Sequence, residues 1–318
     1  MITPSDVTAW QRASPVALNA AQAEQEMLLR RLIIELGNDP LLASTVVCSG
    51  GTTLHQVLLP APRRYSEDLD LLLSADIPAL KPLCDRWHDA IAPNLGASVK
   101  INTRGKFVKF RLTVPSQLQS VVVIKAELAR SPHHIRAATT AQSQTVTMSS
   151  GWFSGAARVA CVDPVTLAAT KVAAIRGRNK PRDLSDLLDM KAILGLSDKA
   201  VALRFDSLFR IPQWTAGKAR QVVSKFHATA KFQQSLQHEI ANGFIPGGFS
   251  LQQAQNVYLG IVDEVEKILK ARKAAAMTMD QTTPRLCGRI VKSTGLPCRL
   301  PLHHRGNCRS ILPSMGRG

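Results

Sequence analysis

The hexapeptide Asp-Leu-Asp-Leu-Leu-Leu at residues 68–73 is the feature that most constrains the fold of this 318-residue chain. Successive side chains of a β-strand point to opposite faces, so the leucines at positions 69, 71, 72 and 73 occupy both faces. A strand that is apolar on both faces belongs to the interior of a sheet. We therefore predict a central strand here, in a mixed α/β domain.

Asp68 and Asp70 interrupt this apolar strand. Residues two apart on a strand share a face, so the two carboxylates are directed at one place and repel each other. A divalent cation between them would offset the repulsion, and Mg²⁺ prefers one or two carboxylates together with phosphate oxygens. The alternative is a pair of solvent-facing aspartates at a sheet edge. The leucines on both faces argue against that alternative.

A glycine pair precedes this strand. Gly50 and Gly51 allow close approach of the backbone to a ligand, Thr52 offers a hydroxyl, and the helical pattern that follows presents free N–H groups to an anion. Together with an aspartate pair further along the chain, this turn predicts a triphosphate cradle beside a metal site.

Hydrophobic periodicity predicts an α/β domain followed by a helical one. After residue 150 the strand signals fade and helices are expected over residues 163–177 and 182–195. We predict a domain at 1–164, a helical domain at 165–278, and a linker (279–285) with a tail to residue 318. The other expected helices are residues 15–37, 51–59 and 77–93, and the other expected strands are residues 45–48, 98–102, 106–114 and 120–130.

The chain is strongly basic, with 40 Lys and Arg against 23 Asp and Glu. The last 38 residues carry seven basic side chains and no acidic one. This excess favours a polyanionic partner, most simply a nucleic acid, over a merely basic surface. The N-terminus lacks an apolar signal core, and the longest apolar runs are too short to cross a bilayer. We therefore expect a cytoplasmic protein with no membrane partner.

Five ordered segments resemble the AbiEii nucleotidyltransferase family, whose members include the mycobacterial MenT toxins. The segments are GGTTL, RYSEDLD, KAE, a helix with Lys171, and RDLSDLLDM, and they span roughly residues 20–200. The resemblance implies a polymerase-β-type nucleotidyltransferase fold and a toxin of a bacterial toxin–antitoxin or phage-defence system. The residues that match the glycine and R-x-S-x-D-x-D signature are Gly50, Gly51, Thr52, Arg64, Ser66, Asp68 and Asp70.

The resemblance also implies roles for later residues. Asp68 and Asp70 match the metal-binding pair, and Glu127 falls where a third acid is expected. Lys171 matches a lysine that supports the triphosphate. Asp186 matches an essential aspartate further along the family's sequence, with Asp183 as the next candidate.

The implied reaction is Mg²⁺-dependent transfer of a nucleotide from a nucleoside triphosphate to an RNA acceptor, with the tRNA 3′ end as the expected acceptor and a cognate antitoxin as a partner. The basic run at residues 176–182 is a candidate contact to acceptor phosphates. Two alternatives remain open at this stage. The protein could modify a small molecule or a protein, or it could be a non-catalytic module that binds nucleic acid.

The tail contains a candidate structural zinc site with the spacing Cys287-x10-Cys298-x4-His303-x4-Cys308. Three thiolates and one imidazole are a typical ligand set for Zn²⁺. His304 is an alternative fourth ligand, and a disordered basic tail is the alternative to a metal site. We expect a small zinc-binding tail.

Overall fold

The computed structural model describes residues 1–74, 80–103, 105–178, 180–209 and 216–282. Residues 1–265 form one compact unit, and residues 266–318 are assigned to a second. The predicted zinc ligands Cys287, Cys298, His303 and Cys308, and the alternative His304, lie outside the described residues. The zinc-binding tail therefore stays a prediction.

A seven-stranded mixed sheet organises the first unit, with the order β3-β4-β5-β2-β1-β7-β6. β2 pairs antiparallel with β1 and parallel with β5, and it occupies the middle of the sheet. The prediction of a central strand in a mixed α/β domain is confirmed. The strands are β1 (Val46–Ser49), β2 (Asp68–Leu73), β3 (Ser98–Asn102), β4 (Phe107–Ser116), β5 (Ser120–Ala129), β6 (Ala141–Ser149) and β7 (Ser154–Val162).

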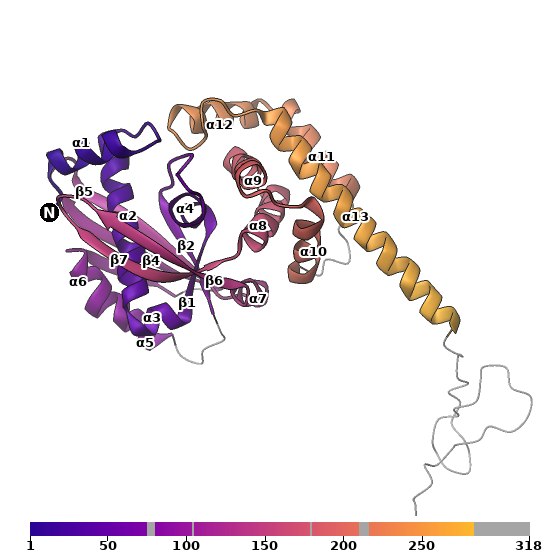
Figure 1. Cartoon of the computed structure of the whole chain (residues 1–318), viewed down its shortest axis with the longest axis horizontal. Helices are drawn as coiled ribbons and strands as arrows, with labels where there is room; N and C mark the ends of the chain where they lie inside the picture. The colour runs from indigo at the N-terminus through magenta and orange to yellow at the C-terminus, as the bar shows by residue number, and fades with distance from the viewer. Residues whose placement is uncertain (75–79, 104, 179, 210–215, 283–318) are drawn as a thin grey trace, which may run out of the picture. The chain divides into compact units, whose positions relative to one another are not determined.

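One face of the sheet is covered by helices, among them α2, which packs on β5, β6 and β7 (Figure 1). Side chains on β4 show this clearly, because Val108, Phe110 and Leu112 are buried while Lys109 and Arg111 are exposed. The helical elements up to residue 138 are α1 (Pro4–Ala13), α2 (Ala20–Asn38), α3 (Pro40–Thr45), α4 (Gly50–Thr53), the π-helical η1 (Leu54–Leu58), α5 (Lys81–Arg86), the π-helical η2 (Trp87–Ile91), α6 (Ala92–Asn94) and α7 (Pro132–Ala138).

The prediction that strand signals fade after residue 150 was wrong. β7 runs parallel to β1 inside the sheet, and β6 pairs with β7 at the edge. The β7 segment SGAARVACV is rich in small residues, which are weak strand formers, so its propensity hid it. Its place between two strands is decided by tertiary pairing.

Three predicted helices have different boundaries in the structure. The helix expected at 77–93 is, within the described residues, the succession of α5, η2 and α6 from Lys81 to Asn94. The helix expected from residue 15 begins at Ala20, because Asn19 and Gln22 form a reciprocal capping box there. A separate helix, α1, precedes it. The helix expected at 51–59 is the four-residue α4 followed by η1, and it ends before Pro60.

Every described element after Val162 is helical, as the sequence predicted. Asp163 caps α8 by accepting a hydrogen bond from the Thr166 N–H at 2.8 Å, and Gly195 in the left-handed region ends α9. The helices are α8 (Pro164–Gly177), α9 (Pro181–Leu194), α10 (Asp198–Phe209), α11 (Ala216–Ala228), α12 (Ala230–Ala241) and α13 (Leu251–Thr282).

The boundary between residues 164 and 165 stays a prediction, since residues on both sides of it belong to the unit 1–265. α13 continues through the first residues of the expected linker at 279–285. None of the helices that the structure describes combines the length and the apolar composition that a membrane crossing requires.

Candidate active site

The glycine turn brings the backbone against one of the paired aspartates. β1 ends at Ser49, and Gly50 follows with a φ of +77°, in the left-handed region that favours glycine. A Cβ on Gly50 would overlap the carboxylate of Asp70. This glycine therefore makes room for a carboxylate of the chain itself.

The second glycine makes room for an arginine. A Cβ on Gly51 would overlap the Arg64 guanidinium. Thr52 is fully buried, and its hydroxyl donates to the Asp68 carbonyl and lies 2.8 Å from the Ser66 hydroxyl. The signature residues Gly51, Thr52, Arg64 and Ser66 thus contact one another beneath the turn.

The carboxylates of β2 have an acidic neighbour on β5. Asp70 is directly opposite Glu127 in the register of the two strands, and the Glu127 carboxylate accepts a hydrogen bond from Lys109 Nζ at 2.7 Å. Burial, and next the charge of Asp68, raise the pKa of Asp70 to about 6. Asp68 and Asp70 make no ion pair with any residue that the structure describes.

Asp186 is the centre of a buried charge network. Arg64 binds it in a bidentate manner, with Nε to Oδ1 at 2.6 Å and Nη2 to Oδ2 at 2.9 Å. Lys171 Nζ lies 2.6 Å from Oδ2, and His55 Nε2 lies 3.0 Å from Oδ1. Burial opposes the charge of Asp186, but the two cations hold its pKa well below the ordinary value.

Lys171 and Arg178 share a second carboxylate. Asp183 is fully buried and accepts from Lys171 Nζ at 3.0 Å and from Arg178 Nε at 2.9 Å. Burial penalises the Lys171 ammonium, yet Asp186 and Asp183 keep its pKa above the ordinary value. Lys171 is 6% exposed, which excludes a surface lysine that extends into water. Arg178 differs, since its side chain is 53% exposed.

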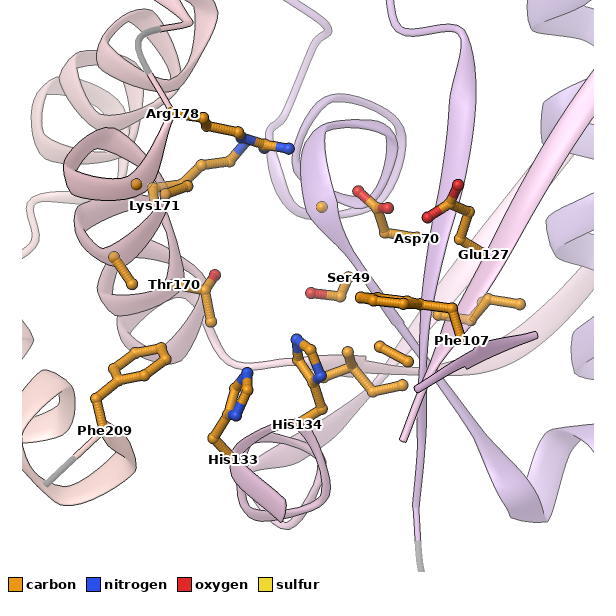
Figure 2. A pocket seen from close by; sticks show the side chains of 17 residues that line it. Ser49, Asp70, Phe107, Glu127, His133, His134, Thr170, Lys171, Arg178 and Phe209 are labelled. Carbon is orange, nitrogen blue, oxygen red and sulfur yellow. The ribbon is translucent and has the colours of Figure 1, made fainter. Parts of the chain in front are cut away.

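These elements enclose a cavity of about 530 Å³ (Figure 2). Asp70 and Glu127 project from the sheet on one side, and Lys171 on α8 and Arg178, the residue after α8, project from the other (Figure 2). The rings of His133, His134 and Phe209 line another part of the cavity (Figure 2). The lining residues are Ser49, Gly50, Asp70, Leu71, Leu72, Phe107, Glu127, Ala129, His133, His134, Thr170, Lys171, Ala173, Ala174, Gly177, Arg178 and Phe209.

A comparison with family models matches residues 36–242 to the family described as nucleotidyl transferase AbiEii toxin, type IV toxin–antitoxin system. The match covers well over half of the chain and contains every element of the cavity. The chain belongs to the AbiEii nucleotidyltransferase toxin family. The resemblance predicted from the five sequence segments is confirmed.

Two solved structures are similar to the chain. MenT4, a nucleotidyltransferase toxin from Mycobacterium tuberculosis H37Rv, is 14% identical, with a TM-score of 0.48 over 82% of this chain and 99% of that one. An antigenic nucleotidyltransferase-like protein from Paracoccidioides brasiliensis is also 14% identical, with a TM-score of 0.38 over 71% of this chain and 94% of that one. A comparison with curated proteins gives no match.

AbiEii membership implies a nucleoside triphosphate and raises the question of a metal ion. Within the described residues, no group of three or more His, Cys, Asp or Glu side chains is arranged to hold one. The pair Asp68 and Asp70 still fits Mg²⁺, which takes one or two carboxylates and completes its shell with water and phosphate. Burial, and next the charge of Asp68, disfavour the ionised form of Asp70 and raise its pKa to about 6.

The structure separates the predicted AbiEii site residues into two groups. Gly50, Asp70, Glu127 and Lys171 line the cavity. Gly51, Thr52, Arg64, Ser66, Asp68 and Asp186 lie outside its lining, and several of them support residues that form it. Of the basic run at 176–182, Arg178 pairs with Asp183, and Arg182 lies near Glu67 at 3.8 Å.

Sequence reasoning missed the aromatic end of the cavity. His133 and His134 have ring centroids 4.0 Å apart, and His133 lies 5.5 Å from the Phe209 ring. Burial lowers the pKa of His133, and burial with His133 lowers that of His134 to about 4, so the neutral form of each ring is favoured. The Pro-His-His start of α7 was the available signal.

Proposed function

We propose that the protein transfers a nucleotide from a nucleoside triphosphate to an RNA acceptor in a Mg²⁺-dependent reaction, with the tRNA 3′ end as the acceptor. In the cell it would inhibit growth and be controlled by a cognate antitoxin. The observation that carries the proposal is the cavity in which Asp70 and Glu127 face Lys171 and Arg178.

Asp68 and Asp70 would hold Mg²⁺, with Glu127 as the nearest third carboxylate. The bound cation would lower the negative charge of the phosphates and the pKa of the attacking hydroxyl. Glu127 Oε1 accepts a hydrogen bond from Lys109 at 2.7 Å, which leaves Oε2 as the oxygen that would bind the cation. The strand register fixes where the carboxylates stand, because Asp68, Asp70 and Glu127 belong to adjacent strands that pair in parallel.

Lys171 on α8 and Arg178, which follows α8, would orient the triphosphate. Lys171 contacts both Asp183 and Asp186, so most of its charge is balanced by the protein. Arg178 shares Asp183 with Lys171 and has its side chain half exposed, which leaves donors for phosphate oxygens. We therefore assign the direct phosphate contact to Arg178 and a supporting role to Lys171.

The aromatic end would take the nucleobase. Neutral imidazole rings and Phe209 offer flat apolar surfaces, and base stacking on such rings contributes about 1–3 kcal/mol. We expect His133→Ala to raise the KM for the nucleoside triphosphate by about tenfold and to leave kcat nearly unchanged, as measured by initial rates. A changed kcat with an unchanged KM would contradict this role.

Incubation with each of the four labelled nucleoside triphosphates and total RNA tests the function directly. We expect label in RNA of tRNA size, located at the 3′ end by nuclease mapping, and none with the Asp68→Ala/Asp70→Ala double variant. Label in protein or in a small molecule would contradict the RNA acceptor. RNA binding without label under any of the four nucleotides would favour a binding module and contradict the enzyme.

A further inference from the structure

The face of the sheet that carries the two aspartates also carries a row of cations. Lys100 on β3 is opposite Arg111 on β4, Arg111 is opposite Lys125 on β5, and Lys125 is opposite Asp68 on β2. Residues directly opposite each other on neighbouring strands project from the same face. Lys100, Arg111 and Lys125, which we call the basic row, thus lead across three strands to Asp68.

The next row along the strands shows the same change of sign. Asn102 is opposite Lys109, Lys109 is opposite Glu127, and Glu127 is opposite Asp70. The charge on this face therefore changes from basic on β3 and β4 to acidic on β2. The acidic end of both rows is the carboxylate pair of the proposed active site.

The basic row is free to bind a ligand. Its three side chains are exposed and alternate with buried neighbours such as Phe110, Leu112 and Ala126. None of the three forms an ion pair with a residue that the structure describes. Like charges that lie directly opposite each other on a sheet are destabilising. The juxtaposition of Lys100, Arg111 and Lys125 therefore costs folding stability, and the acidic residue opposite the row, Asp68, neighbours Lys125 alone.

Protection of a sheet edge does not account for the row. Lysines on an edge strand hinder edge-to-edge association, and this explains Lys100 on β3. Arg111 and Lys125 lie on β4 and β5, which have hydrogen-bonded neighbours on both sides. A binding role explains all three residues together.

We propose that the basic row binds the phosphates of a single-stranded RNA acceptor and leads its 3′ hydroxyl to Asp68 and Asp70. Neighbouring strands are about 4.8 Å apart, so the row extends about 14 Å from Asp68. An RNA whose terminal hydroxyl lies at the carboxylates must place its preceding phosphates on an adjoining surface, and this surface is cationic. The contacts are to the backbone, so they impose no base sequence. This proposal rests on the proposed function, because it takes that site as the place where the acceptor reacts.

The test compares two triple variants with the same change in net charge. Lys100→Thr/Arg111→Thr/Lys125→Thr removes the basic row, and threonine suits an exposed strand position. Arg12→Thr/Lys199→Thr/Lys231→Thr removes three exposed cations that lie on α1, α10 and α12 rather than on the sheet. The probe is a single-stranded RNA oligonucleotide with a free 3′ hydroxyl, and its Kd is measured by fluorescence anisotropy across a series of salt concentrations.

We expect loss of the basic row to raise the Kd at least tenfold at low salt and to reduce the slope of log Kd against log salt by about 2. The acceptor KM should rise in parallel, whereas the affinity for the nucleoside triphosphate and the melting temperature should not fall. Equal slopes and equal Kd values for the two triple variants would overturn the proposal. So would normal RNA binding combined with lost binding of an acidic protein partner.

The binding measurement does not depend on turnover. A wild-type protein that transfers no nucleotide to RNA would contradict the proposed function, whatever the basic row does. A wild-type protein that does transfer, together with a basic-row variant that transfers with the same acceptor KM, would contradict the basic row alone.

Discussion

The two walls of the cavity carry opposite charges that are balanced in different ways. On the helical wall, Lys171 is buried and contacts Asp183 and Asp186 at 3.0 and 2.6 Å. On the sheet wall, Asp70 lies near Asp68 and Glu127, and burial helps to raise its pKa to about 6. The helical wall is balanced by partners within the protein. On the sheet wall the carboxylates of Asp68 and Asp70 repel each other, and neither forms an ion pair with a residue that the structure describes.

The largest effect should come from the sheet wall. Asp68→Asn and Asp70→Asn should each lower the rate of nucleotide transfer about a thousandfold or more, since a catalytic cation contributes several kcal/mol to the transition state. The melting temperature should be equal or higher, because one member of a repelling pair has lost its charge. Rates with labelled nucleoside triphosphate and thermal melts measure the two effects. Transfer within tenfold of wild type would contradict the assignment.

A substitution on the helical wall should mainly lower the free energy of unfolding. Asp186→Asn should lower the free energy of unfolding by about 3–5 kcal/mol, because it leaves Arg64 and Lys171 buried without a full charge partner. Urea unfolding provides the measurement.

Asp189→Asn is the matched control, one turn later on α9. Burial raises the pKa of Asp189 to about 6, and its Oδ2 atom lacks a hydrogen-bond partner within the described residues. This variant should be close to neutral. If Asp186→Asn were as stable as Asp189→Asn while losing activity, Asp186 would belong to the chemistry.

The pH dependence of the free energy of unfolding provides a second test of the helical wall, because His55 contacts Asp186. Its Nδ1 accepts from the Arg63 backbone N–H at 3.3 Å, so Nε2 carries the proton and donates to Asp186. Burial, and next Arg64, lower the pKa of His55 to about 4.

The unfolded chain therefore binds a proton at His55 between about pH 6.5 and 4 that the folded protein does not bind. The free energy of unfolding should fall as the pH falls through this range, by up to about 3 kcal/mol from this residue. His55→Gln keeps a donor for Asp186 and cannot titrate. In urea unfolding at several pH values, the free energy of unfolding of this variant should fall less steeply as the pH falls. The difference in slope should correspond to uptake of up to one proton fewer on unfolding. An unchanged slope would show that His55 is already protonated.

The smallest effect should come from Arg178, the half-exposed arginine of the helical wall. Arg178→Gln should raise the KM for the nucleoside triphosphate about tenfold, because its half-exposed guanidinium loses a charged contact to phosphate. Stability should change little. Lys171→Ala should differ in kind, with a loss of stability and a loss of activity by orders of magnitude. If the two variants behaved alike in urea unfolding, the supporting role of Lys171 would be wrong.

The sequence predicted the sheet wall better than the helical wall, for a physical reason. The strand at residues 68–73 and the shared face of its aspartates follow from local periodicity, and the structure places β2 at those residues. The bond between Arg64 and Asp186 joins positions 122 residues apart, and no local pattern reports such a contact. His55 gave no signal for the same reason. β7 was missed because tertiary pairing, rather than its own propensity, makes it a strand.

The parallel pairing of β1 with β7 has a consequence for how the protein is made. Cys48 on β1 lies opposite Cys161 on β7 in the strand register, and both are free thiols. The cavity is also lined by Lys171 on α8 and by Arg178, the residue that follows α8. A ribosome that has released Asp68 and Asp70 has not yet supplied the strand or the helix that completes the site. Contacts between distant parts of a chain form late. Under the proposed function, a growing chain would lack a complete site until more than half of it had emerged.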